Sequence, residues 1–150
     1  MSVSVASLQQ IVEALADQIT AGVAAQDLGG EALQVWPFLV INPTPPCVDI
    51  YPADPFSDQQ AYGPTRERDA WFTVRARVTP ADADASQQLL LQLMDWRSDT
   101  SVAAAMLTDP TLGGLVNDLL PTGPTGVILY TPIGNEGPLV GCEWRTRVLV

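Results

Sequence analysis

The sequence has 150 residues, of which 47 % are hydrophobic and 16 % charged, a balance typical of a folded domain rather than a disordered chain. Its net charge of −10 disfavours binding to a nucleic-acid backbone, because 17 residues are acidic and all seven basic residues are arginine. No apolar run reaches the roughly 20 residues of a membrane span, and the first residues lack the basic region of a secretory signal. We therefore expect one cytoplasmic domain over residues 1–150 with no membrane contact.

The first third of the chain predicts one helix and two strands. Apolar residues recur at three- and four-residue intervals over residues 5–23, which indicates an amphipathic helix. Residues 34–41 are rich in β-forming side chains, but Pro37 places them at a sheet edge or a bend. Residues 47–52 alternate apolar with polar side chains, as a half-buried strand does.

Residues 53–69 predict an exposed loop, because they are polar, contain two prolines and a glycine, and show no periodicity. Loops of this length are often functional or disordered. One reading is a merely mobile loop. The other is a partner-docking loop, whose candidate contact residues are Phe56, Tyr62, Arg66 and Arg68.

Clear alternation over residues 71–78 predicts a strand with Phe72, Val74, Ala76 and Val78 towards the core. Thr79 then has the position of a helix cap, with Pro80 at the first helical position. This second helix should extend to about Trp96. Its expected core-facing residues are Ala85, Leu89, Leu93 and Trp96.

The segment after Trp96 combines apolar residues with an abrupt break. A short helix should begin at Ser98 or Asp99 and stop at Asp109-Pro110, and Gly113-Gly114 should redirect the chain into one more apolar helical turn over 115–120. Two strands, over 126–130 and 139–150, complete the order. The similarity of WFTVRAR at 71–77 to WRTRV at 144–148 suggests that these two strands are neighbours.

The chemistry of catalysis is poorly represented. The chain contains no histidine and no lysine, which removes most general bases and nitrogen ligands for metals. We expect no enzyme activity, no cofactor and no metal site. For Cys47 and Cys142 we favour buried free thiols, with a disulfide or a reactive thiol as alternatives.

Four of the seven arginines occur on two predicted strands. Arg75 and Arg77 share a strand face with Trp71, and Arg145 and Arg147 share a face of the last strand. One reading is a solvated sheet face. The other is an interface between copies of the chain, in which these arginines pair with carboxylates of the neighbouring copy.

The order of these segments resembles that of the tail terminator (tail-completion) proteins of long-tailed bacteriophages. The similarity includes WPFLVINPTPPCVDIYP after the first helix, WFTVRARV leading into TPADADASQQLLLQLMDW, SVAAAML followed by DPTLGGLV, and the closing VGCEWRTRVLV. It implies a small α+β fold, with a mixed or antiparallel sheet flanked by helices, that assembles as a homohexameric ring.

The resemblance also implies a function at the junction of tail and head in the virion. Such a ring caps the tail tube, ends its polymerisation and joins it to the connector or stopper protein of the head, while DNA passes through the lumen without specific binding. The family has no catalytic residues to carry over. Another head–tail connector protein, or a cytoplasmic module that binds a small ligand, is the alternative.

Overall fold

The computed structural model describes residues 6–24, 33–41, 46–56, 69–79, 83–96, 100–131 and 138–150. In chain order its elements are α1 (Leu8–Ile19), the π-helical turn η1 (Thr20–Ala24), β1 (Gln34–Trp36), β2 (Cys47–Pro52), β3 (Asp69–Val78), α2 (Ala83–Met94), α3 (Val102–Met106), β4 (Asp118–Thr122), β5 (Ile128–Tyr130) and β6 (Leu139–Leu149). None of the helices in these ranges is long and apolar enough to cross a membrane.

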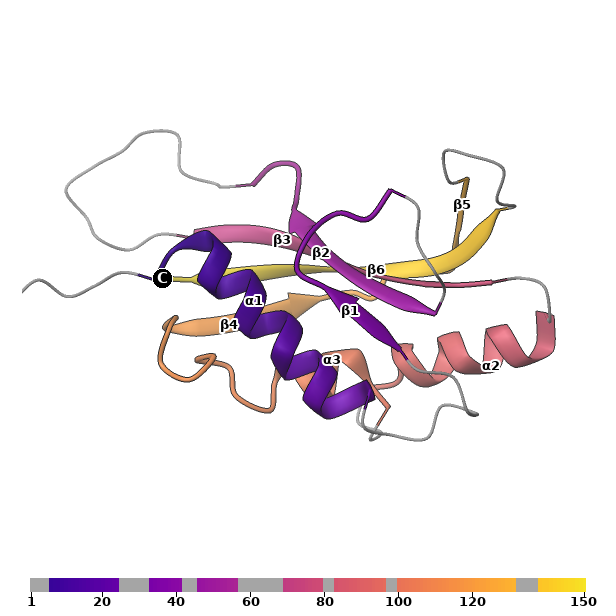
Figure 1. The fold of residues 1–150 in the computed structure, drawn as a ribbon, viewed down its shortest axis with the longest axis horizontal. Coiled ribbons are helices and arrows are strands. Elements are labelled where there is room, and N and C mark those ends of the chain that lie inside the picture. Colours follow the sequence, from indigo (N-terminus) through magenta and orange to yellow (C-terminus); the bar gives the residue numbers. More distant parts are fainter. Residues whose placement is uncertain are drawn as a thin grey trace, which may run out of the picture.

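The strands form one mixed sheet in the order β1-β2-β3-β6-β4, and β5 also pairs with β6. β1 is parallel to β2, and the other pairs are antiparallel. β3 and β6 run side by side along the long axis of the molecule (Figure 1). The predicted α+β class is therefore confirmed, as is the pairing of the strand at 71–78 with the last strand.

One face of the sheet carries the hydrophobic core. Side chains alternate along a strand, and on this face they come from all three long strands: Val48, Ile50, Phe72, Val74, Ala76, Val78, Cys142, Trp144 and Val148. Within the described residues, every fully buried helical side chain belongs to the same core. The helices therefore cover this face, here called the core face, and the opposite face is here called the polar face.

Helix α1 begins where a capping box satisfies its free backbone amides. The Ser7 side chain accepts a hydrogen bond from the amide of Gln10, and the Gln10 side chain accepts one from the amide of Ser7. Gly22, in the turn that follows, lies so close to α3 that a Cβ there would be 2.7 Å from the Cβ of Ala105. The absence of a side chain at Gly22 lets α1 and α3 pack closely.

Two expectations for the middle of the chain are wrong. Trp96 is 84 % exposed rather than buried, because α2 ends at Met94 and the helical periodicity that would direct Trp96 inwards ends with it. The next helix is capped by Ser101, whose side chain accepts a hydrogen bond from the amide of Ala104, and not by Ser98 or Asp99. Residues 97–99 lie outside the described part of the chain.

Residues 115–120 were expected to form a helical turn, but from Asp118 onwards they form the edge strand β4. Leu119 pairs with Val148 of β6 and is fully buried, whereas the neighbouring Leu120 is exposed on the polar face. Pairing with a strand that is distant in the sequence overrides the short apolar periodicity. The helical expectation for this segment is therefore wrong.

The Asp-Pro-Thr-Leu-Gly-Gly break is a tight turn organised by Asp109. Its carboxylate accepts hydrogen bonds from the amide and hydroxyl of Thr111 and from the amide of Gly113. Gly113 and Gly114 both have positive φ angles, 72° and 90°, which glycine adopts without steric strain. The break therefore reverses the chain from α3 into β4.

Candidate functional site

The polar face carries the four arginines that the sequence singled out. β3 contributes Trp71, Arg75 and Arg77 to this face, and β6 contributes Arg145 and Arg147. The register places Arg147 opposite Trp71 and Arg145 opposite Thr73, while Arg75 is opposite Glu143. The arginines therefore form two groups. Arg75 and Arg77 lie on β3, and Arg145 and Arg147 lie on β6, further along the strand pair and beside Trp71.

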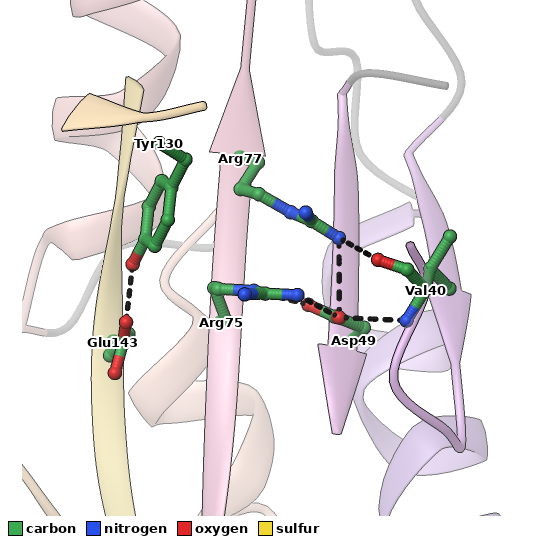
Figure 2. A network of polar contacts seen from close by, with 6 residues as sticks. All are labelled: Val40, Asp49, Arg75, Arg77, Tyr130 and Glu143. Atoms are coloured by element: carbon green, nitrogen blue, oxygen red, sulfur yellow. Dashed lines mark hydrogen bonds and ion pairs between the residues drawn. The ribbon is translucent and has the colours of Figure 1, made fainter. Parts of the chain in front are cut away.

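The first group surrounds a fully buried carboxylate, Asp49 of β2 (Figure 2). Arg75 binds it with two parallel hydrogen bonds, from Nε to Oδ1 at 3.0 Å and from Nη2 to Oδ2 at 2.6 Å. Arg77 Nη2 also donates to Asp49 Oδ2, at 3.2 Å. Arg75 and Arg77 are only 12 % and 4 % exposed, so the reading of a solvated face is wrong for these two residues.

This buried network also fixes the segment that follows β1. The amide of Val40 donates to Asp49 Oδ2 at 3.1 Å, and the carbonyl of Val40 accepts from Arg77 Nη2 at 2.9 Å. Both backbone groups of Val40 point towards the network (Figure 2). Its neighbours Phe38, Leu39 and Ile41 are each more than half exposed, so a fixed backbone presents three apolar side chains to the outside.

Two tyrosines border the network. The guanidinium carbon of Arg75 is 4.9 Å from the ring centroid of Tyr51 and 5.3 Å from that of Tyr130, within cation–π distance of both. The Tyr130 hydroxyl donates to Glu143 Oε2 at 2.6 Å (Figure 2). Burial and this bond to Glu143 raise the pKa of Tyr130, so the hydroxyl keeps its proton at neutral pH.

The charge of Arg75 is stabilised by its partner. Burial acts to lower the pKa of Arg75, but the hydrogen bonds and charge of Asp49 outweigh that effect and the pKa is raised. Asp49 therefore favours the charged form of Arg75, and the ion pairs make the three side chains one structural unit. Such a unit holds β2, β3 and the segment around Val40 together.

The second group is Trp71 with Arg145 and Arg147, here called the Trp71 cluster. The guanidinium carbons of Arg145 and Arg147 lie 4.1 Å and 5.8 Å from the ring centroid of Trp71. Arg147 also pairs with Asp69 at 2.9 Å and remains 39 % exposed. All three side chains of the cluster are partly exposed.

Within the predicted docking loop, residues 53–56 and residue 69 are in the described part of the chain, and Phe56 is the one candidate contact residue among them. The ring of Phe56 is 5.6 Å from that of Phe72 in an edge-to-face contact, and it packs against the core. Tyr62, Arg66 and Arg68 lie outside the described residues. The docking role of this loop therefore stays a prediction.

The cysteines are free thiols, as the sequence analysis favoured. Cys47 pairs with Arg77 on the polar face, whereas Cys142 lies on the core face opposite Ala76. Because the two side chains point to opposite faces of the sheet, they cannot form a disulfide with each other. Burial raises the pKa of both thiols, that of Cys142 to about 12, and disfavours the reactive thiolate.

The site offers ion pairs and aromatic stacking rather than ligands for a metal. In the described ranges, no three Cys, Asp or Glu side chains gather as a metal site would require. No protein-family model matches the sequence. A comparison with curated proteins likewise gives no match.

Proposed function

We propose that this chain is a structural protein of a long-tailed bacteriophage that ends tail assembly. Copies of it form a ring, expected to be hexameric, on the finished tail tube in the virion. The ring stops polymerisation of the tube protein and joins the tail to the connector of the head. DNA then passes through the lumen without specific contacts.

The observation that best supports this proposal is the unequal covering of the two sheet faces. Helices cover the core face, while the polar face carries a partly exposed cluster of one tryptophan and two arginines, Trp71, Arg145 and Arg147. Tryptophan and arginine are enriched at the centres of protein interfaces. A chain that works as a subunit of an assembly needs such a surface.

The electrostatics agree with a ring through which DNA passes. The chain carries a net charge of −10, and two of its seven arginines share one buried carboxylate inside the subunit. A lumen lined by such subunits has few cations with which to hold a phosphate backbone.

An assembly assay tests the proposal directly. Purified tail tube protein is allowed to polymerise with and without the chain, and tube lengths are measured by electron microscopy. We expect rings at tube ends and an arrest of elongation at substoichiometric amounts of the chain. The Gly126→Ala variant serves as a positive control, because a Cβ at this position meets nothing within 4 Å. It should arrest tube growth as the wild type does. Unchanged tube growth and bare tube ends would contradict the proposal.

A further inference from the structure

We propose that the Trp71 cluster of one copy binds the acidic outer side of helix α1 on the next copy, at Glu13 and Asp17. This contact rests on the proposed function, because it assigns the two surfaces that join neighbouring subunits of the ring. It narrows the predicted four-arginine interface to Arg145 and Arg147, which the structure leaves partly exposed.

Arg145 is the cation that the single chain leaves without a carboxylate partner among the described residues. Arg75, Arg77 and Arg147 each form an ion pair, whereas among the described residues the guanidinium of Arg145 donates to the carbonyl of Pro55, at 3.1 Å, and stacks on Trp71. Stacking on the indole holds the guanidinium in place and lowers the entropy lost when it binds. A carboxylate from outside the chain would complete its pairing.

The outer side of α1 supplies two carboxylates. Glu13 and Asp17 are exposed, lie one helical turn apart, and form no ion pair in the described part of the chain. Their spacing of about 6 Å along the helix offers two carboxylates to Arg145, while Arg147 keeps its ion pair with Asp69. The charges of the two surfaces are therefore complementary.

The positions of the two surfaces favour a head-to-tail contact. Helix α1 packs on the core face through Ile11, Leu15 and Ile19, so its acidic side points away from the sheet, whereas the Trp71 cluster lies on the opposite face. Two Trp71 clusters would repel each other, which disfavours a two-fold dimer through this surface. Contacts between two different surfaces generate rings or filaments.

A charge-swap experiment tests the contact. The concentration dependence of assembly is measured by light scattering and analytical ultracentrifugation for wild type, Arg145→Glu, and Arg145→Glu combined with Glu13→Arg and Asp17→Arg. We expect Arg145→Glu to weaken assembly roughly tenfold or more, and the combined variant to recover it. Circular dichroism confirms folding, and Arg145→Gln separates loss of charge from loss of size.

A matched control tests whether recovery depends on the position of the new arginines on α1. Gln88→Arg and Gln92→Arg add positive charge at the same four-residue spacing on the exposed side of α2, and together with Arg145→Glu they should leave assembly weak. Recovery by these α2 changes would overturn the contact with α1.

A different outcome would separate this contact from the proposed function. If Arg145→Glu forms normal rings but these rings fail to join tails or heads, the Trp71 cluster binds another protein. That result would overturn the contact with α1 and leave the proposed function standing. A wild-type chain that is monomeric at every concentration would contradict both.

Discussion

The carboxylate of Asp49 is fully buried between the guanidinium groups of Arg75 and Arg77. Replacing it by alanine leaves two nearly buried charges without a partner and also removes the acceptor for the amide of Val40. We expect Asp49→Ala to lower the free energy of unfolding by about 3–5 kcal/mol, measured by urea denaturation.

A second Asp–Arg pair of the polar face provides the control for this prediction. In the pair of Asp69 and Arg147, the arginine is 39 % exposed and water can solvate it when the carboxylate is removed. Asp69→Ala should therefore lower the free energy of unfolding by about 1 kcal/mol. Equal losses in the two variants would mean that burial does not set the strength of the Asp49 network.

Gly141 is the glycine at which the sheet tolerates no side chain. A Cβ there would lie 2.0 Å from the carbonyl oxygen of Ala76 and 3.0 Å from the Tyr130 ring. Gly141→Ala should lower the free energy of unfolding by about 3 kcal/mol, because β3 and β5 must both shift. Gly126→Ala, where a Cβ meets nothing, should change it by less than about 0.5 kcal/mol in the same denaturation experiment.

Asp109 gives the turn after α3 a defined dependence on pH. Hydrogen bonds from Thr111 and Gly113 lower the pKa of its carboxyl group below the usual 3.8. Because the folded pKa lies below the unfolded one, this stabilisation is present above pH 4 and is lost as the pH falls through the lowered pKa. Asp109→Asn should therefore be less stable than wild type at pH 7, with a smaller difference at pH 2–3.

Thermal and urea unfolding of both proteins across that pH range measure the effect. The relevant quantity is the difference between wild type and variant, since other carboxylates titrate in both. A difference that is the same at pH 7 and pH 2 would show that ionised Asp109 does not stabilise the turn.

Sequence reasoning at the residue scale found the arginines but not their partner. The alternation of β3 correctly placed Arg75 and Arg77 opposite the core, and the alternation of β6 correctly placed Arg145 and Arg147 together on one face. Asp49, however, was assigned to the polar side of a half-buried strand, and its ion pairs join residues 26 and 28 positions apart. Local patterns do not encode such pairs. An aspartate within an otherwise apolar strand was the available signal.

At the scale of elements, Ser101 connects two helices. Its hydroxyl donates to the carbonyl of Asp95, just beyond α2, and accepts from the amide of Ala104 as the cap of α3. Ser101 is 1 % exposed, so water cannot replace either bond. We expect Ser101→Ala to lower the free energy of unfolding by about 2 kcal/mol, against about 1 kcal/mol for Ser7→Ala at the exposed cap of α1.

Thermal denaturation of the two serine variants, with hydrogen exchange of the α3 amides, measures this difference. Faster exchange confined to α3 in Ser101→Ala would agree with the assigned role. A smaller loss for Ser101→Ala than for Ser7→Ala would contradict the idea that burial strengthens this cap.

The accuracy of the predicted elements follows from the strength of their patterns. Long alternating runs predicted β2, β3 and β6 close to their observed bounds, because one face of each strand packs in the core. The segment that became β4 was misassigned, since its few apolar residues fit a helix and a strand equally well. Its structure depends on pairing with β6, which a local window does not contain.

At the scale of the whole molecule, the two sheet faces have different roles. The core face binds the helices and stabilises the fold, and the polar face combines a buried ion network with the partly exposed Trp71 cluster. The exposed side chains of Phe38, Leu39 and Ile41, beside the fixed backbone of Val40, form an apolar surface. The sequence did not predict this surface, because exposure of an apolar run depends on how its backbone is fixed.

The measurement that tests the central claim most directly is electron microscopy of lysates from the phage with this gene disrupted. The account predicts filled heads beside unattached tails of excessive or irregular length, and recovery of joined particles when the wild-type gene is supplied in trans. Tails of normal length beside unattached heads would instead assign the chain to the head side of the neck. Intact, infectious particles would contradict a structural role in the virion.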